Sequence, residues 1–150
     1  LLFFLQKNYS RISLERVLSG PGLLDIYGFI RSVSNDGDSP GKFESIAYPA
    51  SIVEKAIAKS SPVCEQTLQL FVSLYGALAG NLALQYLSNG GVYLAGGIAP
   101  KIVPLLQEGD FMEGFLSKGR FEKYLSEIPV KVVMDESAPL LGAAQYAMAF

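Results

Sequence analysis

The sequence predicts an α/β fold in which short, mainly parallel strands are joined by packed helices. Apolar residues recur with three-to-four spacing between residues 68 and 82, and this spacing is typical of a helix. Short β-rich runs near residues 14–18, 92–94 and 130–134 predict strands. Because helical segments separate these runs, right-handed crossovers and parallel pairing are favoured. Such elements assemble as layers of sheet and helix.

The first part of the chain is expected to form a short helix, then a strand near Leu14–Leu18, then a helix from Pro21 to about Val33. Proline suits the first helical turn because an N–H group there would have no helical partner. Residues 35–41 are dense in turn-forming residues and predict a surface connection, without the ligand spacing of a calcium-binding EF-hand. One face of the helix carries four apolar residues: Leu23, Leu24, Tyr27 and Ile30.

The rest of the chain alternates between predicted helices and strands. A short helix is expected from about Ala50 to Lys59, and a long helix begins at Pro62, again a proline in a first turn. A last helix should start near Ser137 and run toward the C-terminus. Between the two lie strand Val92–Leu94, helical segments Pro100–Gln107, Phe111–Leu116 and Arg120–Ile128, and strand Val130–Met134.

The long helix is apolar enough to raise the question of a membrane span. No Asp, Glu, Lys or Arg occurs from Gln66 to Pro100, and a span needs about 20 apolar residues. We reject a span because polar residues interrupt the segment, no basic cluster or aromatic belt flanks it, and its apolar positions are periodic. A core helix is predicted instead. Its small-residue stripe would admit a second helix, either inside the subunit, which is favoured, or across a dimer contact: Gly76, Gly80 and Ala83.

Composition excludes several kinds of site. The chain has 150 residues, of which 17% are charged, and its formal charge of −2 gives no reason to expect nucleic acid or an anionic membrane as a partner. Because histidine is absent, the chain holds no Ser-His-Asp triad and no histidine metal site. The single cysteine, Cys64, excludes an internal disulfide, fits a reducing cytoplasm and is expected to be buried.

The tract from Gly90 to Pro100 joins a predicted strand to a glycine pair and a helix-starting proline. Glycine has no Cβ, so the ring, ribose or phosphate of a nucleotide can approach the main chain closely. ATP is therefore a candidate ligand, although plain strand-to-helix connections have the same pattern. The tract from Ile12 to Gly22 repeats this order of β-rich run, small-residue turn and proline.

Together, residues 13–22 and 92–100 closely resemble the bacterial-type glucokinase family of the hexokinase and actin-like ATPase superfamily. Residues 34–48 are the least similar part of the chain. The resemblance implies the C-terminal, large-domain part of a sugar kinase with the actin-like, ribonuclease H-like fold. It continues through three further stretches: residues 118–121, 128–130 and 140–144.

Residues 1–150 are expected to be a single-domain fragment. The chain starts at Leu1 without methionine, and the apolar run that follows has neither the basic stretch nor the cleavage site of a signal peptide. With the resemblance, this start indicates the C-terminal part of a glucokinase. The N-terminal part, with the first phosphate-binding loop and the catalytic base, would lie outside this chain.

The resemblance implies a parent enzyme that transfers the γ-phosphoryl group of ATP to the 6-hydroxyl of glucose with the help of Mg²⁺. No catalytic residue or magnesium ligand is assigned to this chain, and the fragment alone is expected to be inactive. Two alternatives stay open, namely a non-catalytic assembly or regulatory module with the same fold and a kinase for another hexose. A cytoplasmic homodimer is expected from the family precedent and the apolar long helix.

Glu15 is the predicted sugar-binding residue. The resemblance implies that its carboxylate accepts hydrogen bonds from sugar hydroxyls, and an ionised carboxylate has two oxygens for this purpose. The alternative is a surface glutamate paired with Arg16. For the nucleotide, Gly96 and Gly97 match the adenosine motif, and Ile98 and Ala99 are expected to line the base.

Four further regions invite a ligand role, but none is given one with preference over a structural role. Ser19, Gly20, Pro21 and Gly22 form a turn that would lie beside the nucleotide, or that simply leads into the helix, which is favoured. Lys101 stands where related sequences often have arginine, but we assign it no contact. Asp135 is adjacent to Glu136 and is interpreted as helix-start chemistry, not as an acid-base pair. The stretch Lys118–Phe121 is interpreted as a solvated turn.

Overall fold

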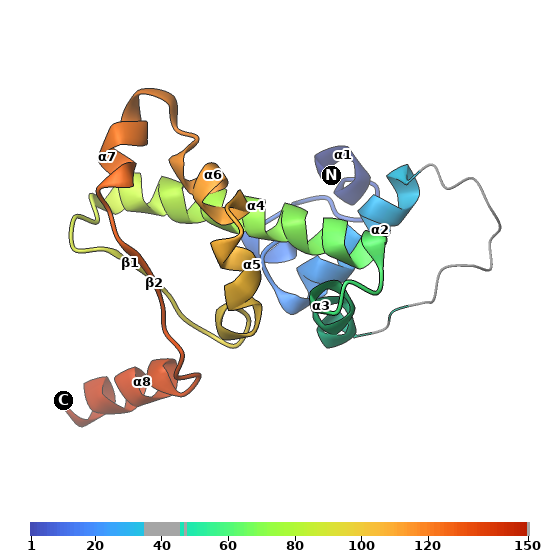
Figure 1. The fold of residues 1–150 in the computed structure, drawn as a ribbon. Helices are drawn as coiled ribbons and strands as arrows, with labels where there is room; N and C mark the ends of the chain where they lie inside the picture. The colour runs from blue at the N-terminus through green and yellow to red at the C-terminus, as the bar shows by residue number, and fades with distance from the viewer. Residues whose placement is uncertain (35–45, 47, 150) are drawn as a thin grey trace. The chain divides into compact units, whose positions relative to one another are not determined.

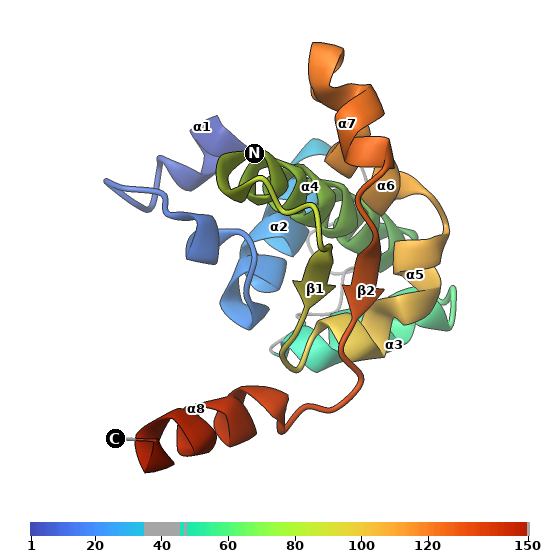
Figure 2. The ribbon, with the colours of Figure 1, turned by 90° about the vertical axis from the view of Figure 1, so that its left-hand side faces the viewer.

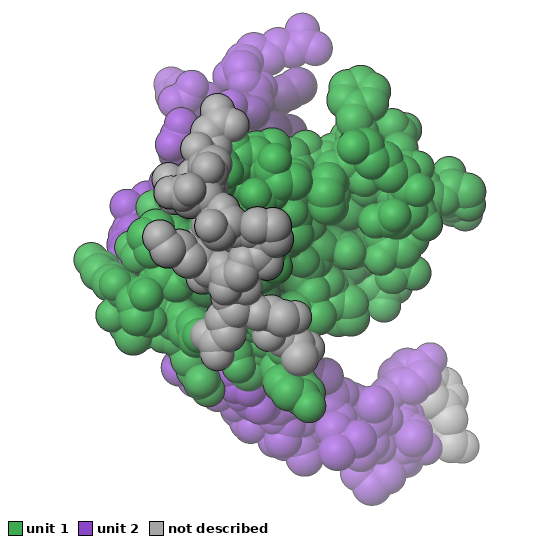
Figure 3. All heavy atoms as spheres, turned by 90° about the vertical axis from the view of Figure 1, so that its right-hand side faces the viewer, with its two compact units in different colours: residues 1–72 green, residues 73–150 purple. Residues whose placement is uncertain are grey.

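A computed structural model describes residues 1–34, 46 and 48–149 (Figure 1). The predicted connection at residues 35–41 lies outside the described residues. The chain divides into two compact units, Leu1–Val72 and Ser73–Phe150, which Figure 3 colours separately. The expectation of a single domain stays a prediction.

Unit 1 is built from helices. It contains α1 (Leu2–Leu5), the 3₁₀ helix η1 (Leu14–Arg16), α2 (Gly20–Val33), α3 (Pro49–Ile57) and the first half of α4 (Pro62–Tyr86). Helix α2 packs against both α3 and η1. The predicted helices of this unit are therefore confirmed, with the prolines of α2 and α3 in their first turns. Fully buried core side chains come from all the α-helices of the unit and include Leu5, Leu23, Ile26, Ile52, Leu68 and Phe71.

The strand predicted near residues 14–18 is wrong, because the structure forms η1 there. The amides of Arg16 and Val17 donate to the carbonyls of Ser13 and Leu14 at 3.0 Å. These local bonds satisfy backbone donors that a strand would have had to pair with a neighbouring strand. In the part of the chain that the structure describes, no strand lies beside this segment. The tracts 12–22 and 90–100 therefore share an order of residue types but not a backbone conformation.

Unit 2 contains a two-stranded parallel sheet, as predicted. Strands β1 (Val92–Leu94) and β2 (Val130–Val132) pair in the register Val92 with Val130 and Leu94 with Val132 (Figure 2). Strand β2 ends two residues before the predicted boundary. The helical segments between the strands are confirmed, and two of them open with a 3₁₀ turn: η2 (Ala99–Ile102), α5 (Val103–Gln107), α6 (Asp110–Leu116), η3 (Gly119–Phe121) and α7 (Glu122–Ser126).

The small residues of α4 are explained by close packing inside unit 2. A Cβ at Gly76 would overlap the carbonyl oxygen of Phe111, and one at Gly80 would overlap that of Phe115. Both carbonyls belong to α6, so the stripe admits the backbone of α6 at van der Waals distance. The favoured prediction of an internal helix contact is confirmed. Not all of the predicted apolar face is covered, because Leu82 remains 41% exposed.

Helix α4 is the one helix in the described ranges that is long and apolar enough to cross a membrane. Such a helix is weak evidence for a membrane protein, because core helices of globular proteins pass the same test. Of its most apolar 18-residue window, 44% is buried inside the protein. Cys64 and Phe71 are almost completely buried on this helix, as expected of core side chains.

The last helix, α8 (Ala138–Met148), is also confirmed, and most of it is exposed. Its start is organised by Asp135, whose Oδ1 accepts hydrogen bonds from the Ser137 amide at 2.8 Å and the Ser137 hydroxyl at 2.6 Å. These bonds stabilise the ionised carboxylate and hold the pKa of Asp135 below its ordinary value. A carboxyl group with a lowered pKa is suited to the start of a helix and not to general acid catalysis, as the sequence predicts for Asp135.

Candidate functional site

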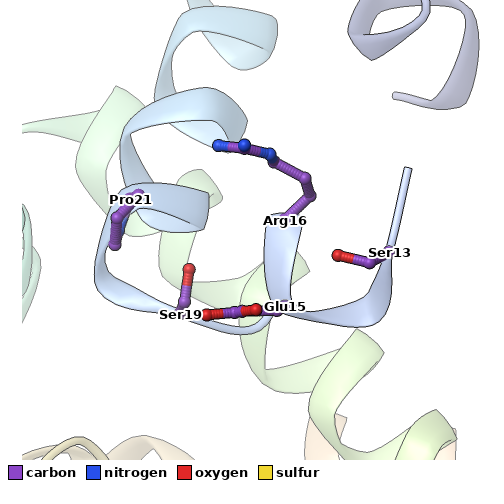
Figure 4. A pocket seen from close by; sticks show the side chains of 5 residues that line it. All are labelled: Ser13, Glu15, Arg16, Ser19 and Pro21. Carbon is purple, nitrogen blue, oxygen red and sulfur yellow. The ribbon is translucent and has the colours of Figure 1, made fainter. Parts of the chain in front are cut away.

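In unit 1, η1 and the start of α2 form a small pocket that is open to solvent (Figure 4). Its volume is about 150 Å³. The pocket brings together two of the predicted site residues, Glu15 and Ser19, and adds three neighbours. The pocket exists because η1 turns the chain back toward the start of α2. An extended strand would have carried Glu15 away from that helix start. The residues that line it are Ser13, Glu15, Arg16, Ser19 and Pro21.

The carboxylate of Glu15 is exposed and has no hydrogen bond or ion pair with any described residue. The alternative pairing with Arg16 does not occur. The Arg16 guanidinium lies instead over the ring of Tyr9, 4.3 Å from its centroid. Figure 4 shows Arg16 extending away from Glu15, whose side chain lies next to Ser19. Both carboxylate oxygens are consequently available to a ligand with hydroxyl donors.

Ser19 has a structural role in the same place. Its Oγ accepts a hydrogen bond from the Gly22 amide at 3.1 Å, so Ser19 is the N-cap of α2. This bond satisfies one of the amides that a helix start leaves without a partner. The favoured interpretation of the turn, as the lead into the helix, thus has a bond to support it. A ligand contact by Ser19 or Gly20 stays a prediction.

Gly22, which belongs to the turn predicted to lie beside the nucleotide, has a packing role in the structure. A Cβ at Gly22 would overlap the carbonyl oxygen of Val17, at the end of η1. A Cβ at Gly20, by contrast, would meet only the Pro49 ring at an ordinary 3.5 Å. Gly22 is therefore the glycine that lets η1 pack against α2. Its signal in the sequence is its place directly after Pro21, in the first turn of the helix.

The predicted adenosine-facing residues lie in unit 2, directly after β1. Gly96 has a φ of +103°, a conformation that favours glycine, and a Cβ there would meet nothing within 4 Å. A Cβ at Gly97 would be 3.9 Å from Oε2 of Glu136. Ile98 is half-buried at the start of η2. The turn is thus open to a ligand. The positive φ by itself also accounts for a glycine at position 96, so a nucleotide contact stays a prediction.

Charged side chains near this turn are engaged with each other. Lys101 lies 3.7 Å from Glu136, and both side chains are more than half exposed. Lys101, to which no ligand contact is assigned, has a carboxylate partner in the structure. The stretch from Lys118 to Phe121 forms η3 between α6 and α7, and Lys118 donates to the Gly114 carbonyl at 3.1 Å. Its interpretation as a turn between helices is confirmed.

Among the described residues, no group of three or more Asp, Glu, Cys or His side chains is placed to hold a metal ion. Carboxylates of the two candidate regions, Glu15 and Glu136, belong to different units. Among the described residues, the η1 pocket offers the Glu15 carboxylate, and the turn after β1 separately offers open main chain.

Comparison with known proteins identifies the family. A family model described as glucokinase matches residues 1–150. A glucokinase of Synechocystis sp. is 41% identical over 160 residues, covering 96% of this chain and 45% of that protein. A glucokinase of Nostoc punctiforme is 45% identical over 148 residues, covering 89% of this chain and 43% of that protein. The chain spans less than half the length of these curated relatives.

A solved structure shows the same fold. The crystal structure of a glucokinase from an Antarctic psychrotroph matches with a TM-score of 0.81 and 36% sequence identity. The match covers 95% of this chain and 42% of that chain. The predicted α/β fold, with its short parallel strands and packed helices, is therefore the fold of the corresponding part of a known sugar kinase.

Proposed function

Because the chain belongs to the glucokinase family, we propose that it forms part of an enzyme that transfers the γ-phosphoryl group of ATP to the 6-hydroxyl of glucose. In this proposal, residues 1–150 are the C-terminal part of that enzyme. The observation that carries the proposal is the unpaired carboxylate of Glu15 in its pocket, on a chain that matches glucokinases along nearly its whole length.

Glu15 binds the sugar in this proposal. A hydrogen bond to an ionised carboxylate is stronger than one between neutral groups, and two oxygens can accept from two hydroxyls of one sugar. The pocket, at about 150 Å³, is smaller than ordinary ligand sites, which span roughly 300–1,000 Å³. The remaining walls and the base that takes the proton of the 6-hydroxyl would come from the rest of the enzyme.

The open turn at Gly96 and Gly97 faces the adenosine of ATP in this proposal. Phosphoryl transfer depends mainly on positioning and on charge stabilisation, and Mg²⁺ supplies the latter when it is bound with ATP. The residues of this chain would contribute to positioning, one on the sugar side and two on the nucleotide side. Cytoplasmic location, homodimer formation and the absence of nucleic-acid or membrane partners belong to the same proposal and are untested.

The test is a coupled assay of ATP-dependent glucose phosphorylation on the full-length protein, beside the variant Glu15→Gln. Loss of a charged hydrogen bond costs about 1.5–3 kcal/mol, so the KM for glucose should rise roughly 10- to 150-fold while the KM for ATP is unchanged. Glu54→Gln is the matched control, because Glu54 is exposed on α3 and lies outside the pocket. It should leave both constants unchanged.

Three results would overturn parts of the proposal. If a folded full-length protein phosphorylates no hexose, the kinase proposal fails and a non-catalytic module takes its place. If another hexose is the better substrate, the assignment of glucose is wrong. If Glu15→Gln leaves the KM for glucose unchanged in an active enzyme, the role of Glu15 is wrong although the kinase stands.

A further inference from the structure

Helix α2, whose start lines the pocket, also carries a carboxylate that the proposed function does not use. Asp25 is half-buried, and its Oδ1 accepts a hydrogen bond from the Tyr9 hydroxyl at 3.2 Å. The second oxygen, Oδ2, is buried and has no hydrogen-bond partner in the described part of the chain. A buried carboxylate oxygen without a partner destabilises a fold, so a structure that retains one calls for an explanation.

Tyr9 joins this carboxylate to η1. One end of Tyr9, its hydroxyl, is bonded to Asp25 of α2, while the face of its ring carries the Arg16 guanidinium at 4.3 Å. This distance is well inside the roughly 6 Å range of a cation–π contact. A carboxylate that accepts from the hydroxyl makes the ring more electron-rich, which strengthens its attraction for the cation. Asp25, Tyr9 and Arg16 therefore form one connected chain of contacts from α2 to η1.

The chain of contacts ends on the residue next to Glu15. Only three residues form η1, so its backbone bonds alone hold it weakly. With the Arg16 side chain stacked on Tyr9, η1 has a second attachment, and Arg16 is directed away from the carboxylate of Glu15. Without that attachment, η1 would be free to shift, and Arg16 would be free to neutralise Glu15.

We propose that Tyr9 and Asp25 are positioning residues that hold η1 through Arg16 and so keep the carboxylate of Glu15 placed and unpaired for a sugar. The sugar-binding part of this inference rests on the proposed function. The attachment of η1 does not, because it concerns the ligand-free protein. Two measurements on the full-length protein therefore separate the two parts.

The first measurement is hydrogen exchange at the amides of Val17 and Leu18, which both donate to the Leu14 carbonyl across η1. Tyr9→Leu removes the ring and should raise the exchange rates at these amides several-fold. Tyr9→Phe keeps the ring and removes only the bond to Asp25, so it should have a smaller effect. Tyr86→Leu is the control, because Tyr86 is 70% exposed in unit 2, and it should change nothing at η1. Unchanged exchange in Tyr9→Leu would overturn the inference.

The second measurement is the KM for glucose of Tyr9→Leu, Arg16→Met and the double variant. Each single variant should raise this KM about threefold to tenfold without changing the KM for ATP, and the double variant should be no worse than the more affected single variant. A merely structural role would lower thermal stability and leave the KM of the folded enzyme alone. An unchanged KM, or effects that multiply in the double variant, would overturn the positioning role. If the protein phosphorylates no hexose, the proposed function fails and the exchange result decides the inference.

Discussion

The two candidate regions, the η1 pocket and the turn after β1, share an order of residue types in the sequence but differ in structure. Residues 12–22 and 90–100 both place small residues and a proline behind a β-rich run. The first forms a 3₁₀ helix and the second follows a paired strand. The η1 pocket therefore presents a side chain, the Glu15 carboxylate, whereas the turn at Gly96 presents open main chain. A shared pattern of small residues and proline therefore does not specify which kind of contact a site can make.

The largest expected effect, after that of Glu15→Gln on the KM for glucose, comes from Gly22→Ala in the first region. A methyl group there overlaps the Val17 carbonyl, so η1 or α2 must move. Overpacking of this kind typically costs about 1–3 kcal/mol of the free energy of unfolding. Denaturant unfolding of the full-length protein measures it. Gly20→Ala is the matched control and should be nearly neutral, because its methyl group meets only Pro49 at 3.5 Å. Equal stability of the two variants would contradict the packing of η1 on α2.

An intermediate effect is expected for Gly96→Ala in the second region. The positive φ at Gly96 costs an alanine roughly 1–2 kcal/mol, although the space around it is open. Gly97→Ala lacks this strain and should leave stability nearly unchanged. Thermal unfolding tests these stabilities, and the KM for ATP tests the site. If adenosine lies against the turn, both variants should raise the KM for ATP. If neither does, the turn is a plain strand-to-helix connection.

The smallest expected effect is that of Ser137→Ala, at the start of α8. The Ser137 hydroxyl bonds to Asp135 and is the leading cause of its lowered pKa. Removing it should raise this pKa toward the ordinary value, which an NMR titration of the carboxyl group would detect. Since the folded pKa is lowered, the stabilisation is present above the unfolded pKa and is lost as the pH falls through the folded pKa. Stability should therefore fall slightly at neutral pH and stay unchanged at lower pH. Glu136→Gln should leave the pKa shift in place.

Much of the fold could be predicted from local sequence. The prolines at residues 21, 49 and 62 start helices, because the missing N–H has no partner in a first turn. The strand at Val92–Leu94 was predicted with correct bounds, and β2 with a late end. The error at residues 14–18 has a physical cause. A strand requires a neighbour to accept its hydrogen bonds, and a run of residues does not reveal whether that neighbour exists.

For the candidate site too, the sequence and the tertiary structure supply different information. The family resemblance placed Glu15 in a sugar-binding role, but it could not show whether its carboxylate is paired with Arg16. That depends on Tyr9, which lies seven positions earlier than Arg16, and on Asp25, which lies on another helix. Neither residue has a local pattern that marks it. Only the packing of η1 on α2 brings them together.

The sequence by itself determined the family, because the motifs and their spacing specify it. It also determined the order of the helices and the places where glycine and proline begin or end them, because these follow from short-range backbone preferences. Tertiary structure alone decided that residues 14–16 form a 3₁₀ helix, that Gly76 and Gly80 admit the backbone of α6, and that Arg16 stacks on Tyr9. The physical reason is that each of these outcomes depends on which element lies beside the residues concerned, and no local pattern specifies that neighbour.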